Sequence, residues 1–220
     1  MTGRNFDCPT YRVLVKTKES APINGIVGPI SKERLPTDWD FEWPYIWDRT
    51  DFSGQAIIAL SVEGAVWGVV KFGLYPCGDT DISPEVMVVE QLEAHPSRNK
   101  NRSPFLSKPP PSPEPYIDPV GRWLMWYACQ IALDNCQPEE EKPLIVLDAA
   151  FDAVDYYIDI IGMKMTDDSV SSSGEDSYGF SFDTDEAEDF WAMQHVSFGK
   201  PQRISEKYAE SDPKEKHQSG

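Results

Sequence analysis

The segment from Pro143 to Met163 constrains the fold more than any other part of the chain, because it joins a strand signal directly to a helix signal. Leu144 to Leu147 is a short apolar run of the kind that forms a buried strand. The small residues Asp148 to Ala150 follow, and then comes a helical stretch with two adjacent tyrosines that Gly162 ends. A strand followed at once by a helix predicts an α/β fold.

A β-hairpin is expected from Gln55 to Tyr75. The runs Gln55 to Val62 and Ala65 to Tyr75 are rich in β-branched and aromatic residues, and Glu63-Gly64 between them predicts a tight turn. Tyr11 to Thr17 alternates apolar and polar residues, and Glu85 to Glu93 is a further β-rich run. Both are therefore expected to be strands.

A helix is expected from Val120 to Asn135, with Asp118 as its N-cap and Pro119 as its first helical residue. Its apolar face contains Val120, Leu124, Tyr127, Ala128 and Ile131. This helix would connect the strand near Val88 to the strand near Val146 in a parallel crossover. Such crossovers place a ligand crevice at the carboxyl ends of the strands.

The remaining segments give weaker signals. Residues 20–50 are expected to form short helical turns and a loop packed by tryptophans, and the last strand is either Tyr178 to Asp183 or Phe190 to Val196. Residues 1–198 are predicted to form one domain with a Pro-rich insert at about 97–118. Residues 199–220 are expected to be a polar, flexible tail.

The 220 residues carry a formal net charge of −17. This length is enough for one domain with a substantial core. The acidic balance argues against nucleic acid as a partner, because phosphate backbones are bound by clusters of Lys and Arg. Two interpretations of the charge stay open: a cationic substrate such as an amine, polyamine or basic peptide, or acidic segments that confer solubility.

Several sites and locations are not expected. The four cysteines and three histidines are scattered, so no metal site is predicted. Cys129 is expected to be a packing residue, and no Gly-x-Ser-x-Gly, P-loop, kinase or HExxH motif occurs. The N-terminus lacks an apolar signal core, and the run Ala56 to Tyr75 is interrupted by charges. A cytoplasmic protein without a membrane span is expected, as a monomer or a homodimer.

Three stretches resemble motifs of the GNAT (general-control-related N-acetyltransferase) superfamily. Ala153, Tyr156 and Tyr157 have the spacings of that family's fourth helix, although Gly162 comes one residue late and Met163 replaces the usual Phe. Leu92 to Arg98 is similar to the end of its fourth strand and the loop that follows. Pro119-Val120-Gly121-Arg122 is similar to its Gly-x-Gly-Arg phosphate loop, with Pro119 in place of the first glycine and Tyr116 in place of the leading Arg or Gln.

This resemblance implies a GNAT-like single domain, in which helices flank a central mixed, twisted sheet and a V-shaped cleft separates the fourth and fifth strands. It also implies acetyl-CoA as co-substrate and a primary amine as acceptor. The residues implied in cofactor binding are Ala94, His95, Arg98, Val120, Gly121 and Arg122. Pro119 lacks an N–H donor, for which Arg98, Lys100, Arg102 and Lys108 could compensate. The alternative is that Gly121 only allows helix and sheet to pack closely.

The resemblance further implies that a tyrosine protonates the departing thiolate and that a carboxylate accepts the amine proton. Tyr157 is the first candidate acid and Tyr156 the second, and either one is alternatively a core aromatic. Glu90 is the first candidate base, with Glu93 three residues away and expected on the opposite face of the strand. His95 and Asp148 are further candidates for the base, and solvated carboxylates are the alternative interpretation.

Three functions are therefore compared. The first is an N-acetyltransferase acting on an amine, with a cationic acceptor as one option. The second is an inactive GNAT-like binding or regulatory module, whose Pro-rich insert would engage a partner. The third is an acyltransferase that uses a longer acyl chain.

Overall fold

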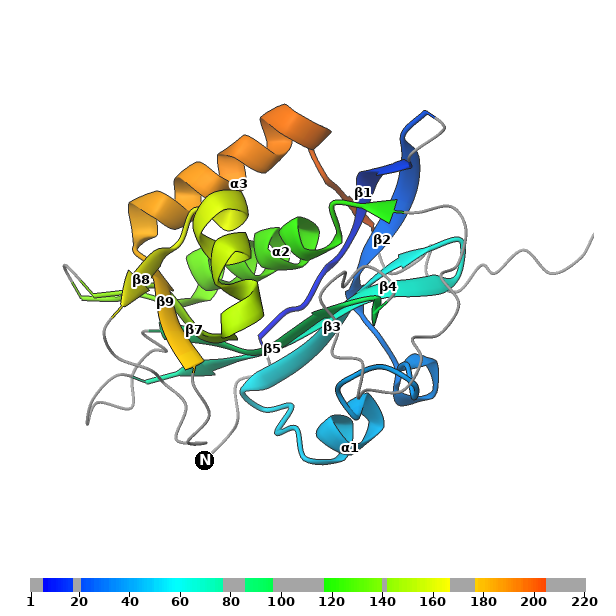
Figure 1. Ribbon diagram of the computed structural model, residues 1–220, viewed down its shortest axis with the longest axis horizontal. Coiled ribbons are helices and arrows are strands. Elements are labelled where there is room, and N and C mark those ends of the chain that lie inside the picture. The colour runs from blue at the N-terminus through cyan, green and yellow to red at the C-terminus, as the bar shows by residue number, and fades with distance from the viewer. Residues whose placement is uncertain are drawn as a thin grey trace, which may run out of the picture.

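The computed structural model describes residues 6–17, 21–76, 86–96, 117–139, 142–166 and 177–204. Figure 1 shows one mixed sheet with α2 and α3 on one face and α1 on the other. Among the described residues, nine strands follow the order β10-β1-β2-β3-β4-β5-β7-β9-β8, and a tenth strand, β6, pairs with β1. The predicted α/β class is confirmed.

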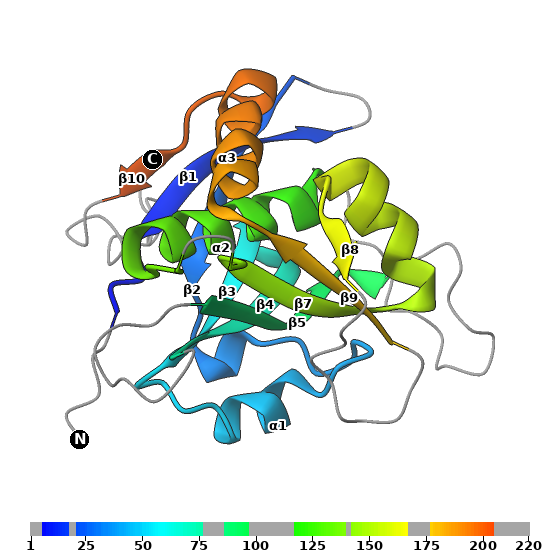
Figure 2. The same ribbon diagram turned by 90° about the vertical axis from the view of Figure 1, so that its left-hand side faces the viewer.

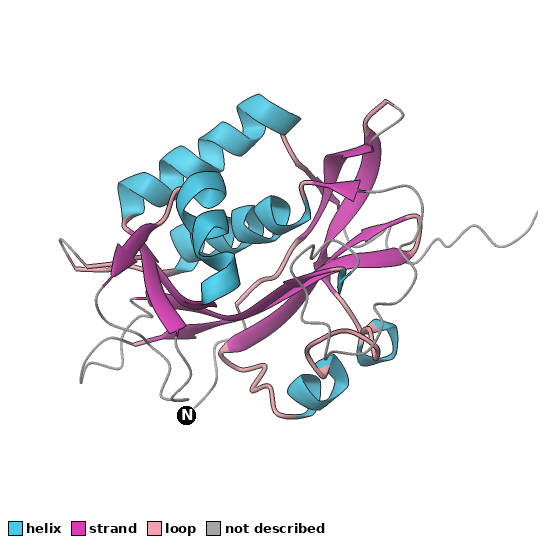
Figure 3. Cartoon of the chain, in the orientation of Figure 1, coloured by secondary structure: helices cyan, strands magenta, loops and turns pink. Residues whose placement is uncertain are grey.

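Figure 3 colours the helices and strands of the described residues by type. The strands are β1 Thr10–Thr17, β2 Ile23–Pro29, β3 Gln55–Val62, β4 Ala65–Tyr75, β5 Val86–Ala94, β6 Ile117–Asp118, β7 Ile145–Ala150, β8 Lys164–Thr166, β9 Ser177–Phe182 and β10 Gln202–Ile204. The helices are η1 Lys32–Arg34, α1 Trp43–Asp48, α2 Val120–Asn135, η3 Phe151–Ala153, η4 Tyr156–Ile161 and α3 Thr184–Phe198.

The predicted hairpin is confirmed as β3 and β4. Glu63 and Gly64 form its turn, with φ angles of 50° and 82°. Positive φ at both central residues gives the backbone twist that suits a two-residue hairpin, and glycine adopts it without steric cost. β5 continues this antiparallel order beside β4.

The predicted parallel crossover is confirmed as β5, α2 and β7. β5 pairs with β7 at three positions only, ending at Val89 and Leu147. Beyond them β5 continues beside β4 as far as Ala94, and β7 continues beside β9 as far as Ala150. The two strands therefore keep their outer partners while their mutual pairing stops.

The main core lies between α2 and the sheet. All five residues of the predicted α2 face are buried, and Trp123 and Trp126 are buried as well because α3 covers the outer side of the helix (Figure 2). The Trp123 indole N–H donates to the Leu14 carbonyl at 2.9 Å, and the Tyr127 hydroxyl donates to the Pro9 carbonyl at 2.8 Å. These bonds satisfy the polar tips of two otherwise apolar side chains.

A second, smaller core lies on the other face of the sheet. Trp43 of α1 is fully buried there against β3 and β4, and Trp39 and Trp47 pack around it. The expected short helices in residues 20–50 are present, but the expectation missed β2. The segment Ile23–Pro29 contains two glycines and a proline, which hid its strand character.

Two boundary expectations were wrong, and one of the two alternatives given for a late strand is confirmed. Asp118 belongs to β6, and Pro119 takes the N-cap position without a side-chain cap. The alternative strand Phe190 to Val196 is part of α3, whereas β9 confirms the strand near Tyr178 to Phe182. The tail does not begin at residue 199, because Gln202–Ile204 forms β10 beside β1. Residues 97–116 of the Pro-rich insert and 205–220 lie outside the described residues.

Within the part of the chain that the structure describes, no helix combines the length and apolar character needed to cross a bilayer.

Candidate functional site

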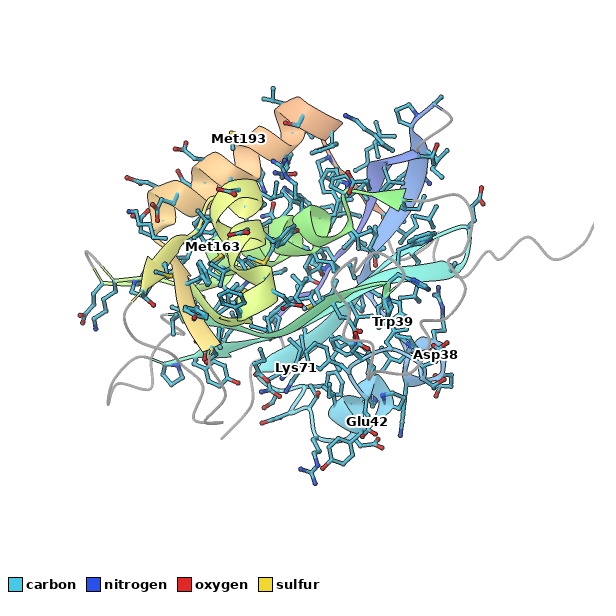
Figure 4. The ribbon with its side chains drawn as sticks, in the orientation of Figure 1. Asp38, Trp39, Glu42, Lys71, Met163 and Met193 are labelled. Carbon is cyan, nitrogen blue, oxygen red and sulfur yellow. The ribbon has the colours of Figure 1, made fainter. Side chains whose placement is uncertain are left out.

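A cavity of about 770 Å³ lies where β5 and β7 stop pairing. Its walls come from both faces of the sheet: residues 119–122 and Tyr156 belong to the α2 side, and Asp40 and Phe41 precede α1. Figure 4 shows the same two sides, with Met163 among the helices above the sheet and Trp39 and Glu42 beside α1. Residues from both faces of the sheet therefore line the cavity.

Glu93 is buried and holds the segment before α1 against β5. Its carboxylate accepts hydrogen bonds from the Asp40 N–H at 2.8 Å, the Phe41 N–H at 3.3 Å and the Trp43 indole at 2.8 Å. Burial raises the pKa of Glu93, and these three donors act against that rise. Glu93 lines the cavity and at the same time places Asp40 and Phe41 in its wall.

Glu90 also lines the cavity and lies in a polar network. Lys71 forms an ion pair with it at 2.5 Å, and the Tyr75 hydroxyl and the Gln55 amide donate to it at 2.6 and 2.7 Å. Burial raises the pKa of Tyr75, and its hydrogen bond to Glu90 raises it further. Lys71 is 8% exposed, so this ion pair is largely shielded from solvent.

The expectation that Glu90 and Glu93 lie on opposite faces was wrong. The β4–β5 register passes from Lys71–Gln91 to Phe72–Val89, so Glu90 is an extra residue in a β-bulge. A bulge shifts the alternation of side chains by one position. Both carboxylates consequently contact groups on the α1 face.

The N-terminus of α2 forms the opposite wall. Gly121 leaves room for the Tyr156 hydroxyl, since a Cβ at this position would overlap it. The Arg122 guanidinium lies 5.4 Å from the ring centre of Phe198 and lines the cavity. The buried Nε of Arg122 has no hydrogen-bond partner among the described residues. This wall therefore combines helix N–H groups with a cation, an arrangement that suits an anion.

The two candidate tyrosines have different environments. Tyr157 is buried against Phe180, with ring centres 5.4 Å apart, and burial raises its pKa. Tyr156 is half-buried and extends over Gly121. Both line the cavity. Tyr156 to Ile161 form η4, a π-helix, and Gly162 follows it with a φ of 85°. The wider turn of a π-helix holds one residue more than an α-helical turn, which accounts for the one-residue delay of Gly162 noted in the sequence.

Only some of the other predicted cofactor residues line the cavity. Ala94 and Val120 line the cavity, and so does Asp148, a candidate base. His95 does not, because its ring packs beside Trp39 and Trp67 at 5.4 and 5.6 Å, where burial lowers its pKa. The insert residues Arg98, Lys100, Arg102 and Lys108 lie outside the described residues.

The lining residues that the sequence interpretation missed include Asp40, Phe41, Gln91 and Asp152. Asp40 and Phe41 are some fifty positions from Glu93, and no local signal marks that contact. Gln91 follows the bulge, which has no sequence signature here. Asp152 lies two residues after the predicted strand and its small-residue joint, so the sequence offered a signal for it.

Among the described residues, no group of three or more His, Cys, Asp or Glu side chains is placed to hold a metal ion.

No family model and no curated protein matches the chain. Among solved structures, an acetoin utilization protein from Exiguobacterium sibiricum 255-15 matches with a TM-score of 0.45 and 14% sequence identity. The match covers 87% of this chain and 98% of that one. This likeness is too distant to carry an activity over to the chain.

Proposed function

We propose that the protein is an N-acetyltransferase that transfers an acetyl group from acetyl-CoA to a primary amine. The observation that carries this proposal is the cavity between β5 and β7 beyond Val89 and Leu147. We interpret the end of pairing as the V-shaped cleft of a GNAT-like fold. The resemblance of Ala153, Tyr156 and Tyr157 to the family's fourth helix agrees with this interpretation.

Acetyl-CoA would bind at the α2 side of the cavity. The N–H groups of Val120, Gly121 and Arg122 are the first of the helix and have no partner within it, so they suit the pyrophosphate. The Arg122 guanidinium adds a positive charge at the same wall. Its buried Nε, without a partner among the described residues, is a donor that a phosphate oxygen would satisfy.

In the proposed reaction the neutral amine nitrogen attacks the thioester carbonyl, a C–N bond forms and the C–S bond breaks. We assign Glu90 to accept the amine proton, because its carboxylate lines the cavity and is less deeply buried than that of Glu93. Glu93 is bound by two main-chain amides and an indole, none of which accepts a proton. We assign Tyr156 to protonate the thiolate, because its hydroxyl lies at the start of α2, whereas Tyr157 is packed in the core.

The first test is acetyl-CoA binding. At about 100 times its Kd the cofactor is expected to stabilise the protein by about 2.7 kcal/mol, measured as a rise in melting temperature. Arg122→Gln should weaken binding about tenfold in calorimetry, equivalent to about 1.4 kcal/mol. Arg49→Gln is the matched control, because Arg49 lies over Tyr45 away from the cavity and should leave the affinity unchanged. Absence of stabilisation by acetyl-CoA would contradict the proposal.

A binding module without transfer activity is the second candidate. Two observations favour it: Pro119 offers no N–H donor, and the Tyr156 hydroxyl covers the backbone at Gly121. The release of free CoA in the presence of amines separates the two functions. A module that has lost the cofactor site would show neither stabilisation by acetyl-CoA nor release of CoA.

A further inference from the structure

Carboxylates dominate the charge of the cavity. Of the lining residues that the structure describes, Arg122 alone is positive, and it lies at the start of α2 together with the N–H groups of the helix start. Six lining residues carry carboxylates: Asp40, Glu90 and Glu93 belong to the α1 side, Asp118 belongs to β6 just before α2, and Asp148 and Asp152 belong to β7 and η3. A cavity with one cation and six carboxylates suits a cationic ligand beside the group that Arg122 would bind.

The α1 side is held in a fixed conformation. Glu93 bonds the main-chain N–H groups of Asp40 and Phe41, so both residues stay in the cavity wall. The Phe41 ring packs edge-on against Trp43 at 5.8 Å and remains 40% exposed. A carboxylate next to an exposed aromatic ring is a combination that binds ammonium groups by charge and by cation–π attraction.

Gln91 provides an independent indication of a ligand with N–H donors. It lines the cavity on the strand that carries Glu90 and Glu93. Its buried Oε1 accepts no hydrogen bond from the described residues. Buried polar atoms normally have a partner, and an amine or ammonium group would supply one.

The chemistry of transfer then limits the acceptor. The nitrogen that reacts must be neutral, because a protonated amine has no lone pair with which to attack. A carboxylate at Asp40 gains by binding an ammonium group only if that group keeps its charge. The group bound at Asp40 and the group that reacts are therefore different groups of the same acceptor.

We infer that the acceptor is a small aliphatic diamine or polyamine, with a charged amino group bound at Asp40 and Phe41 and a second, neutral amino group next to Glu90. This inference rests on the proposed transferase function and names its substrate class. A volume of about 770 Å³ is in the range of small-molecule sites. Because both amino groups would be bound inside this one cavity, a small molecule is favoured over a protein lysine.

The test uses three acceptors with six-carbon chains that differ only in the distal group: hexamethylenediamine, hexylamine and aminocaproic acid. Acetyl-CoA-dependent release of CoA is measured for each. The diamine should have a kcat/KM about tenfold above that of hexylamine, and the acid should be poorer than hexylamine. Equal values for the diamine and hexylamine would overturn the inference.

Two variants test whether Asp40 recognises the distal amino group of the diamine. Asp40→Asn should reduce the preference for the diamine to near unity, while Asp38→Asn should retain it. Asp38 is exposed on the same segment and does not line the cavity, so it removes the same charge from a neighbouring position. Retention of the full preference in Asp40→Asn, with the melting temperature unchanged, would also overturn the inference.

The outcomes separate the inference from the function on which it rests. If calorimetry shows acetyl-CoA binding and hexylamine is acetylated as fast as the diamine, the transferase stands and the diamine specificity fails. If acetyl-CoA does not bind, the transferase itself fails. If a lysine-containing peptide is acetylated more efficiently than the diamine, the small-molecule acceptor is wrong.

Discussion

Glu93 connects the two layers at the scale of a single residue. It lies on β5 and accepts three hydrogen bonds from the segment before α1. Removing it leaves two main-chain N–H groups and the Trp43 indole without an acceptor. We predict that Glu93→Ala lowers the free energy of unfolding by about 3 kcal/mol, measured by urea denaturation. The exposed Glu188→Ala is the control and should change it by less than about 0.5 kcal/mol.

The same residue gives a pH dependence. Burial raises the pKa of Glu93 above 4.5, so the folded protein holds this proton more tightly than the unfolded chain does. Its contribution to stability is then largest at low pH and is lost as the pH rises through the folded pKa. The free energy of unfolding should therefore fall across this window relative to that of Glu93→Gln, which does not titrate. An opposite slope would show that the three N–H donors outweigh burial.

At the scale of elements, α3 depends on the cap at its start. The Asp183 side chain accepts from the Glu186 N–H at 2.9 Å, and the Glu186 side chain accepts from the Asp183 N–H at 3.1 Å. We predict that Asp183→Ala costs about 1 kcal/mol of unfolding free energy by urea denaturation. Asp189→Ala, at an exposed position within the helix, should cost less than half of this.

The cap should also lose strength in acid. The hydrogen bond from the Glu186 N–H lowers the pKa of Asp183 below 3.8, so its contribution is present above that value and is lost as the pH falls. The difference between the wild type and Asp183→Ala should therefore shrink towards pH 3. A difference that is constant with pH would contradict a charged cap.

These elements also show which features the sequence could predict. The β3–β4 hairpin and α2 follow from local turn chemistry and periodicity, and both were predicted within a residue or two. α3 was missed although Asp183 and Glu186 have capping-box spacing, because the apolar run at Phe190 was given more weight. The bulge at Glu90 and the contact of Glu93 with Asp40 could not be predicted. Each depends on a partner strand or segment distant in sequence.

At the scale of the whole molecule, the charge of −17 acts on stability and on ligand binding in opposite directions. Repulsion among carboxylates destabilises the compact state, and the same field attracts a cation to the carboxylates of the cavity. Salt screens both effects, since the Debye length falls from about 30 Å at 0.01 M to about 10 Å at 0.1 M ionic strength. Raising the ionic strength should therefore stabilise the fold and weaken binding of the cationic acceptor.

We predict that raising NaCl from about 20 mM to about 200 mM increases the melting temperature by a few degrees and weakens acetylation of hexamethylenediamine several-fold. The KM for hexylamine should change less, because its distal end carries no charge, and this comparison separates screening from a general effect of salt on the enzyme. Differential scanning calorimetry and the CoA-release assay measure the two responses on the same preparation. A melting temperature that falls with NaCl would show that attractive ion pairs such as Lys71–Glu90 outweigh the net repulsion. An unchanged KM for the diamine would show that the charge of the molecule does not contribute to capture of the acceptor.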